Sequence, residues 1–209
     1  WTACAGGLAE ETAPPTDAPK GVALVEGETV YGMIRVWLQS LGNRSALGLP
    51  LDGSYSVDGD RGFQFEPGTE IALGLDGGHI VMKVGGATID MGGGFSLTRH
   101  LDDEGNAGGV YIHESEKDTL YAGNVSFSAR SGSIRVIVNV DIEDYLYGVV
   151  PYEMSDTFPL EALKAQAVAA RTYAMQRRTR NITEEYDVVD TANDKVYKGL
   201  DTRFERPMQ

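Results

Sequence analysis

The sequence predicts an α+β fold, in which a strand-rich antiparallel part is followed by a mainly helical segment. Two patterns support this prediction. Between about residues 29 and 140, short runs of alternating apolar and polar residues are separated by glycine-containing turns, which is typical of β-strands. After Asp141 the apolar residues recur at helical spacing instead. Glycine accounts for 26 of the 209 residues, which fits a chain with many tight turns. We therefore expect a strand-rich subdomain over 29–140 and a helical segment over 141–209.

Residues 1–28 are predicted to be a flexible N-terminal linker, because residues 10–20 are rich in proline, threonine and acidic side chains and have no apolar period. The first seven residues, WTACAGG, resemble the end of a bacterial lipoprotein signal, in which Cys4 would carry the lipid. The alternative is a cysteine without a role near the terminus. Apart from this lipid anchor at Cys4, we expect no contact with a membrane.

The strand-rich subdomain is predicted to form an antiparallel sheet or a barrel-like layer. Glycine pairs or triplets punctuate it, as at Asp76-Gly77-Gly78 and Gly92-Gly93-Gly94. The runs predicted to be strands are Ile34–Leu38, Ile71–Leu75, Ile80–Val84, Ala87–Met91, Phe95–Arg99, Val110–Ile112, Val125–Ala129 and Ile134–Val140.

Two helices are predicted after Asp141. A short one spans Ile142–Val150 and should end before Pro151, which disfavours helical backbone in the residue before it. A long one runs from Pro159 to about Arg178, is rich in alanine and contains no breaker. Its apolar stripe includes Ala170 and Ala174, and small residues of this kind allow a neighbour to approach closely.

Composition excludes several kinds of function. The formal charge of -13 makes nucleic acid a poor partner, because the chain and a phosphate backbone repel each other. A single cysteine cannot form an internal disulfide or a cysteine-rich zinc site. The three histidines have no metal-ligand spacing, and no apolar run approaches the roughly 20 residues of a membrane helix. Neither a metal nor another cofactor is expected.

The stretch VDIEDYLYGVVPYEMSDTFPLEALKAQAVAARTYAM, residues 140–175, resembles the signature segment of the SpoIID/LytB family. That family comprises the stage II sporulation protein D and the amidase enhancers, which are bacterial cell-wall proteins. Its pattern includes E-D-Y-L-x-G-V-V-x-x-E-M and E-A-L-K-A-Q-A-V-A-A-R-T-Y-A. Downstream, Asp190-Thr191 and Lys195-Val196-Tyr197-Lys198-Gly199 resemble the family's D-T-x-x-x-Q-V-Y-x-G segment.

The chain departs from the family in two respects. Some relatives bind a metal through Cys or His near the downstream segment, but this chain has Ala192, Asn193 and Asp194 there, so no metal site is inferred. The family's domain also usually runs well beyond the position of Gln209, so we expect the domain to be truncated at the C-terminus.

The resemblance implies a lytic transglycosylase of peptidoglycan, acting outside the cytoplasm in the cell envelope. Such an enzyme cleaves between N-acetylmuramic acid and N-acetylglucosamine, with one carboxyl group as both acid and base. Glu153 matches the glutamate that the family uses for this step. Its apolar neighbours Val149, Val150 and Met154 would partly remove its carboxyl group from water and so keep a proton on it near neutral pH.

The remaining site residues are expected to line a groove for the glycan. Residues at helical spacing on the long helix would bind sugar hydroxyls, acetamides or carboxylates, and the locally basic balance of 164–180 suits an anionic glycan. The predicted substrate-binding residues are Lys164, Gln166, Arg171, Tyr173 and, on a weaker match, Tyr197. The alternative is a non-catalytic peptidoglycan-binding module that stimulates a cell-wall amidase. Glycan strands are the expected partner in both cases.

Overall fold

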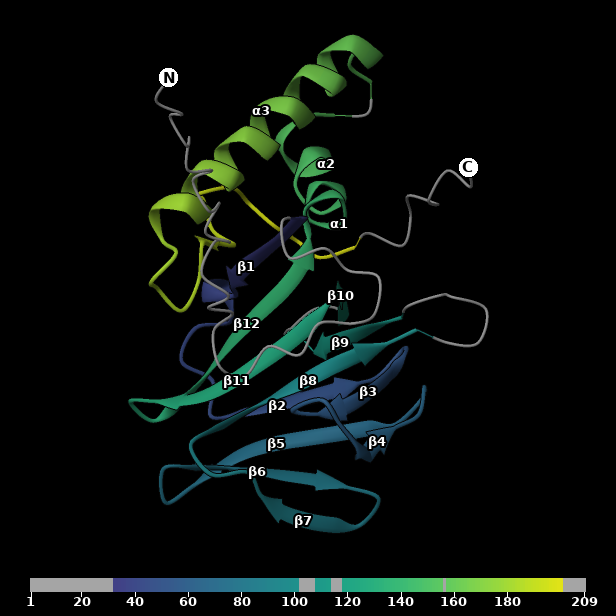
Figure 1. The fold of residues 1–209 in the computed structure, drawn as a ribbon, viewed down its shortest axis with the longest axis vertical. Helices are drawn as coiled ribbons and strands as arrows, with labels where there is room; N and C mark the ends of the chain where they lie inside the picture. The colour runs from purple at the N-terminus through teal and green to yellow at the C-terminus, as the bar shows by residue number, and fades with distance from the viewer. Residues whose placement is uncertain (1–31, 102–107, 114–117, 156, 201–209) are drawn as a thin grey trace, which may run out of the picture.

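The structure is a computed structural model that describes residues 32–101, 108–113, 118–155 and 157–200. The linker predicted over residues 1–28, with Cys4, lies outside the described residues. Figure 1 shows the strands stacked below a layer of helices at one end of the molecule. The predicted α+β fold is confirmed.

A seven-stranded sheet forms the centre of the molecule. Its strands, in spatial order, are β13 (Val188–Val189), β1 (Met33–Trp37), β12 (Ser133–Asp141), β11 (Asn124–Arg130), β8 (Gly94–His100), β3 (Ser54–Val57) and β4 (Asp60–Phe65). Neighbouring strands are antiparallel, except that β13 runs parallel to β1. Because β13 follows the helices in the chain, the segments 29–140 and 141–209 share one sheet, and their division into subdomains stays a prediction.

Two smaller sheets complete the strand layers. The four-stranded sheet has the order β2 (Ala46–Pro50), β5 (Glu70–Asp76), β6 (His79–Val84) and β7 (Ala87–Asp90), and β9 (Gly109–His113) pairs with β10 (Asp118–Ala122). A single turn of 3-10 helix, η2 (Gln39–Leu41), follows β1.

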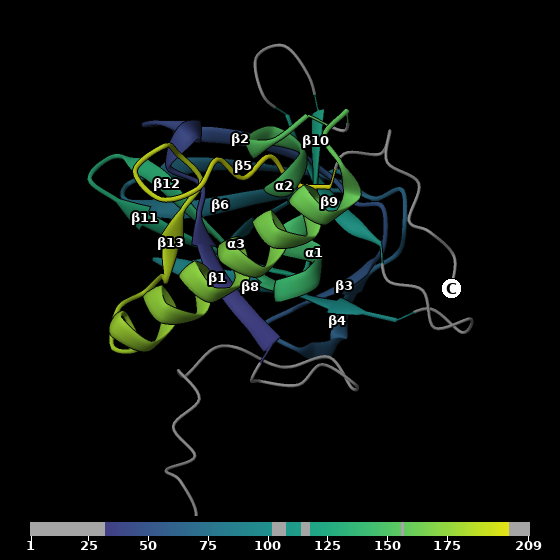
Figure 2. The same cartoon turned by 90° about the horizontal axis from the view of Figure 1, so that it is seen from above.

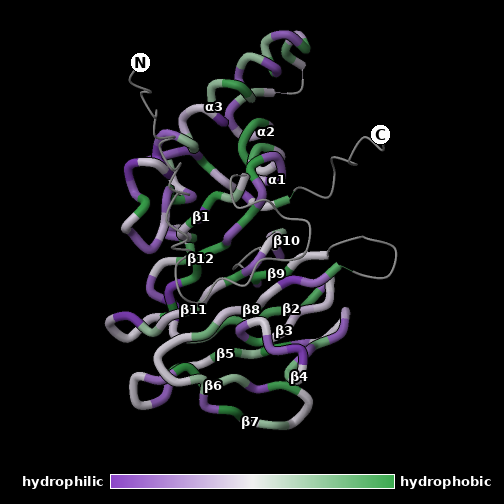
Figure 3. Tube along the Cα trace, in the orientation of Figure 1, coloured by the Kyte–Doolittle hydropathy of each residue, from purple (hydrophilic) through white to green (hydrophobic). Residues whose placement is uncertain are grey.

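The core lies between the strand layers and follows from the alternating pattern of the sequence. In β12 the side chains of Ile134, Val136, Val138 and Val140 are buried, and they share one face of the strand because successive side chains alternate. The rings of Phe95 and Phe127, on neighbouring strands, stack at 5.0 Å. Figure 3 shows hydrophobic and hydrophilic stretches alternating along the strands.

Each predicted strand overlaps a strand of the structure, and those over Ile34–Leu38 and Ala87–Met91 extend one residue too far, but β2, β3, β4, β10 and β13 were not predicted. The missed strands lack clear alternation. β2 contains Gly48 and Pro50, β4 begins with three exposed residues, and β13 has only two residues. Their pairing depends on neighbours that are distant in the sequence.

The helix predicted over 142–150 ends earlier in the structure. Helix α1 (Ile142–Tyr147) stops at Gly148, and a second helix, α2 (Val150–Glu153), begins two residues later. Pro151 lies in the first turn of α2, where its missing N–H removes no intrahelical hydrogen bond. Glycine is required at 148, because a Cβ there would lie 2.5 Å from the Tyr197 ring and 2.4 Å from the Gly199 carbonyl oxygen.

The long helix α3 (Leu160–Arg180) begins one residue later than predicted and ends two residues later. It crosses above β1 in Figure 2. Only Ala170 and Ala174 of this helix are buried, whereas Leu160 is 64% exposed and Val168 58%. The predicted stripe of small residues therefore packs against the sheet in its C-terminal half alone. None of the described helices is long and apolar enough to span a membrane.

Candidate active site

Glu153 is the last residue of α2 and lies at the surface of the helical layer. Its carboxylate oxygen Oε2 accepts a hydrogen bond from the Lys195 ammonium at 2.9 Å. The side chains are partly covered, with 23% of Glu153 and 28% of Lys195 exposed. The site thus joins α2 to a segment more than 40 residues further along the chain.

The apolar neighbours expected around Glu153 do not supply the partner of its carboxylate. Val149 is fully buried in the core, and the carboxylate pairs with the Lys195 ammonium. This contact was not foreseen, because it comes from a segment distant in the sequence. Because α2 continues through Glu153, its side chain reaches the segment around Lys195.

Asp194 holds the segment that presents Lys195. Its carboxylate is only 3% exposed and accepts hydrogen bonds from the Tyr173 hydroxyl at 2.5 Å and from the Val189 backbone N–H at 2.8 Å. The Arg177 Nε atom lies 3.1 Å from the same carboxylate and completes an ion pair. These contacts tie the buried Asp194 carboxylate to α3 and to β13. The backbone of Lys195, the next residue, therefore has a fixed position.

Tyr145 of α1 lies beneath these groups. It is fully buried, and its hydroxyl has no hydrogen-bond partner among the described residues. Burial raises the pKa of the Tyr145 hydroxyl, and the charges of Asp194, Tyr173 and Glu153 raise it further. The side chain of Tyr145 is therefore a neutral phenol close to the site.

Tyr173 is the predicted substrate-binding residue that the structure connects to Glu153. Its hydroxyl donates to Asp194, next to Lys195. Burial raises the pKa of Tyr173, and the hydrogen bond to the Asp194 carboxylate adds to this shift. In this arrangement the hydroxyl is engaged within the protein and supports the site.

The predicted cations of α3 are also engaged. Arg171 makes a two-point contact with Glu143 of α1, at 2.9 and 2.6 Å. Lys164 pairs with Glu161 one turn earlier at 2.9 Å. The basic balance expected over 164–180 is thus offset by neighbouring carboxylates. Gln166 is half-buried on the same helix.

Tyr197, the weakest predicted contact, lies in the core and not on a groove. It is fully buried, and its ring packs against Tyr145 at 5.2 Å and Tyr121 at 5.8 Å. Burial raises its pKa. The Tyr197 ring packs against α1 through Tyr145 and leaves no room for a side chain at Gly148.

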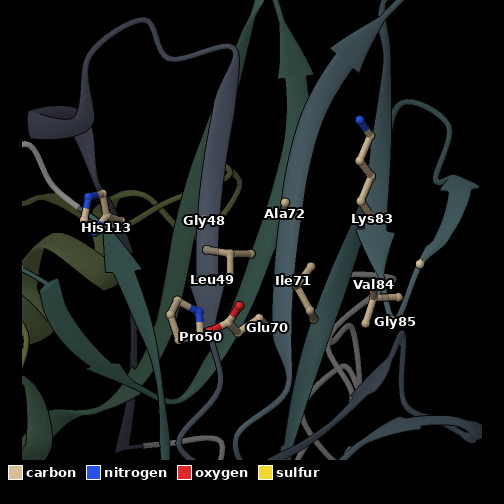
Figure 4. Close-up of a pocket in the computed structure, with 11 residues that line it drawn as sticks. Gly48, Leu49, Pro50, Glu70, Ile71, Ala72, Lys83, Val84, Gly85 and His113 are labelled. Carbon is tan, nitrogen blue, oxygen red and sulfur yellow. The ribbon is translucent and has the colours of Figure 1, made fainter.

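Among the described residues, no group of three or more His, Cys, Asp or Glu side chains could hold a metal ion. A hollow of about 420 Å³ lies far from Glu153, on the four-stranded sheet. Figure 4 shows the residues that line it, with Leu49, Ile71 and Ala72 between His113 on one side and Lys83 on the other. This hollow carries none of the residues predicted to act on a glycan.

The sequence analysis missed three members of the site, Lys195, Asp194 and Arg177. A signal for Lys195 was present, because the family segment D-T-x-x-x-Q-V-Y-x-G has glutamine at the position that Lys195 occupies. The departure places a cation beside Glu153. Asp194 and Arg177 could not be found in this way, since their importance comes from burial and from contact between distant segments.

The fold and site define an α+β protein in which a helical segment carries a surface carboxylate on a scaffold of strands. Residues 130–208 match the family model SpoIID, described as Stage II sporulation protein. This part of the chain is therefore similar to the SpoIID family.

The curated relatives agree with the family model. The chain is 40% identical over 85 residues to the Stage II sporulation protein D of Bacillus subtilis, a match that covers 39% of this chain and 25% of that protein. It is 38% identical over 84 residues to the protein of the same name from Bacillus amyloliquefaciens, covering 38% of this chain and 24% of that protein. An uncharacterised protein of Brachyspira hyodysenteriae is 46% identical over 80 residues, covering 38% and 22%. The chain thus matches about a quarter of the length of these relatives. No solved structure matches it.

Proposed function

We propose that this chain cleaves peptidoglycan glycan strands as a lytic transglycosylase, with Glu153 as its single acid and base. The similarity of residues 130–208 to the SpoIID family supports a role at the bacterial cell wall. The observation that carries the finer proposal is the position of Glu153, which lies at the surface in the matched segment with its carboxylate held at a fixed place.

The proposed reaction needs only one carboxyl group. The Glu153 carboxyl donates its proton to the glycosidic oxygen as the bond from C1 of the muramyl residue to that oxygen breaks. The muramyl 6-hydroxyl oxygen then bonds to C1, and its proton passes to the Glu153 carboxylate. The product is a 1,6-anhydro end, and the acid is restored without a water molecule. A hydrolytic glycosidase would need a second carboxylate for water or for a covalent intermediate.

The substrate places the reaction outside the cytoplasm, in the cell envelope. Of the predicted binding residues, Lys164, Gln166 and Arg171 lie on α3, and glycan would compete with the carboxylates that now pair with Lys164 and Arg171. Tyr173 and Tyr197 act in this proposal by supporting the site, because one donates to Asp194 and the other is buried.

The second candidate is a non-catalytic module that binds peptidoglycan and stimulates a cell-wall amidase. The ion pair between Glu153 and Lys195 favours it, since the carboxylate is already engaged by a cation of the same chain.

The test is the incubation of the purified chain with glycan strands, with and without stem peptides, followed by analysis for anhydro-muramyl products. Glu153→Gln keeps the shape of the side chain but cannot act as acid or base, so we expect product formation to fall by about 10²- to 10⁴-fold. Glu70→Gln, at an exposed position on β5, serves as the matched control and should retain wild-type activity. Absence of product from wild type, with glycan binding retained in both proteins, would favour the amidase enhancer.

A further inference from the structure

Lys195 is the residue whose contact with Glu153 the family pattern does not foresee. Its ammonium lies 2.9 Å from the Glu153 carboxylate, and both side chains are less than one-third exposed. Exposed ion pairs hold their partners weakly because water competes with them. Partial cover reduces that competition, so this pair constrains the carboxylate more than a fully exposed pair would.

The position of Lys195 is set by the residue before it. The Asp194 carboxylate is 3% exposed and is held by the Tyr173 hydroxyl, the Arg177 guanidinium and the Val189 N–H. The backbone of the segment is therefore fixed on α3 and β13, and only the lysine side chain spans the remaining distance to α2. The Lys195 ammonium therefore has few positions available to it.

We propose that Lys195 is a positioning residue for Glu153, because its ammonium holds the Glu153 carboxylate in one place. The assignment rests on the proposed function, because only a reaction at Glu153 gives this contact a catalytic consequence. Lys195 itself touches no reacting atom. Its effect is exerted entirely through the carboxylate of Glu153.

The charged and titratable groups around Glu153 come from several elements. Tyr145 faces it from α1, Tyr173 and Arg177 lie on α3, and Asp194 and Lys195 belong to the segment after β13. The two tyrosines remain neutral at ordinary pH, and Asp194 and Arg177 are paired with each other. Lys195 is therefore the cation of this group that acts directly on Glu153.

This placement has a consequence for the proposed reaction. Without the Lys195 ammonium, the Glu153 carboxyl group can take several orientations, and fewer of them reach the glycosidic oxygen. Loss of the Lys195 charge should therefore lower kcat while KM stays nearly the same, and a cation at the same position should restore kcat.

The experiment compares the wild-type chain with Lys195→Gln, which introduces the residue of the family pattern, Lys195→Met as a second uncharged variant and Lys195→Arg, which keeps the charge. Lys83→Gln, an exposed change on β6, is the control. The first readout is the NMR order parameter of the Glu153 side chain, measured without substrate. The second is kcat and KM for anhydro-product release. Circular dichroism verifies that each variant is folded.

We expect the order parameter of the Glu153 side chain to fall in both uncharged variants, and kcat to fall by about 10- to 100-fold with KM within about twofold of the wild type. Lys195→Arg and Lys83→Gln should follow the wild type.

An order parameter of Glu153 that is the same in wild type and in both uncharged variants would overturn the assignment, as would an equal change in Lys195→Arg. An unchanged kcat in both uncharged variants would overturn it as well. An order parameter that falls as expected in the variants, together with a wild-type chain that forms no anhydro product, would instead refute the proposed transglycosylase.

Discussion

The strand layers and the helical layer of this molecule bury their residues in opposite ways. In β12, a strand of nine residues, the side chains of one face are fully buried. In α3, a helix of 21 residues, only Ala170 and Ala174 are buried. Stability should therefore come mainly from the strands, whereas the helical layer is free to present charged groups at the surface.

The same contrast separates two ion pairs. Arg35 and Asp187 join β1 to the turn before β13, and their side chains are 16% and 1% exposed. Lys195 and Glu153 join the segment after β13 to α2, with more of each side chain in water. The first pair fixes the sheet edge and the second fixes a surface carboxylate. The predictions below are designed to break or refine this division.

The largest loss of stability is expected for Phe127→Ala in β11. Phe127 is 2% exposed and stacks on Phe95, so truncation leaves a cavity and should lower the free energy of unfolding by about 3–5 kcal/mol. Val168→Ala, on the exposed part of α3, should change it by less than about 0.5 kcal/mol. Urea titration of both variants measures the difference. Equal losses would show that the helical layer contributes as much as the sheets.

The next largest loss is expected for Asp187→Ala. This change removes the carboxylate that accepts hydrogen bonds from the Arg35 side chain and backbone N–H, and it leaves a half-buried cation without its anion. The free energy of unfolding should fall by about 3 kcal/mol. Glu185→Ala is the matched control, since Glu185 pairs with Arg130 and Arg135 at an exposed position and should cost less than about 1 kcal/mol. Similar values for the two variants would contradict the assignment of Asp187 to the sheet edge.

The pH dependence of stability should respond to Asp190, which follows β13. Burial raises the pKa of Asp190 above its ordinary value of 3.8, against the opposing effects of its hydrogen bonds from Ser40 and of the Lys198 charge. The folded protein thus binds the proton more tightly than the unfolded chain. The resulting stability is present below about pH 4 and is lost as the pH rises through the pKa of the folded state.

The test is Asp190→Asn, which cannot ionise. Urea titrations at intervals from pH 4 to pH 7 should show the free energy of unfolding of the variant, relative to wild type, increasing with pH. A relative stability that is flat or decreasing over this range would mean that the buried carboxyl group is not the cause.

The smallest effect is expected for Arg171→Gln. The pair with Glu143 is at the surface, with side chains 38% and 58% exposed, so its loss should change the free energy of unfolding by less than about 1 kcal/mol. If Arg171 also binds glycan, the variant should raise KM without changing kcat. Unchanged KM together with a marked loss of stability would assign Arg171 to the joint between α1 and α3 instead.

The sequence predicted the parts of this structure that local patterns determine. Strands with clear alternation and the long alanine-rich helix follow from residues that are close in the chain. The break at Gly148 was missed because it depends on contact with Tyr197 and Gly199, about 50 residues away. The same reason explains why Asp194 was overlooked, since its partners Tyr173 and Arg177 lie on α3.

The electrostatics of the site differed most from the prediction. A basic surface was expected on α3, but Lys164 and Arg171 each have a carboxylate within 3 Å. The Glu153 carboxylate was predicted to lie among apolar side chains, and the structure shows that it accepts a hydrogen bond from the Lys195 ammonium. Counts of charge along a sequence cannot reveal which charges pair in space, so these features required the fold.

The central claim is that Glu153 in the helical layer performs the chemistry while the strands support it. The most direct measurement is mass spectrometry of glycan strands after incubation with the wild-type chain or with Glu153→Gln. The account predicts anhydro-muramyl ends from wild type and almost none from the variant, with the two proteins equally stable to urea. Equal product from both proteins would contradict it, because the reaction would then proceed without the Glu153 carboxyl group.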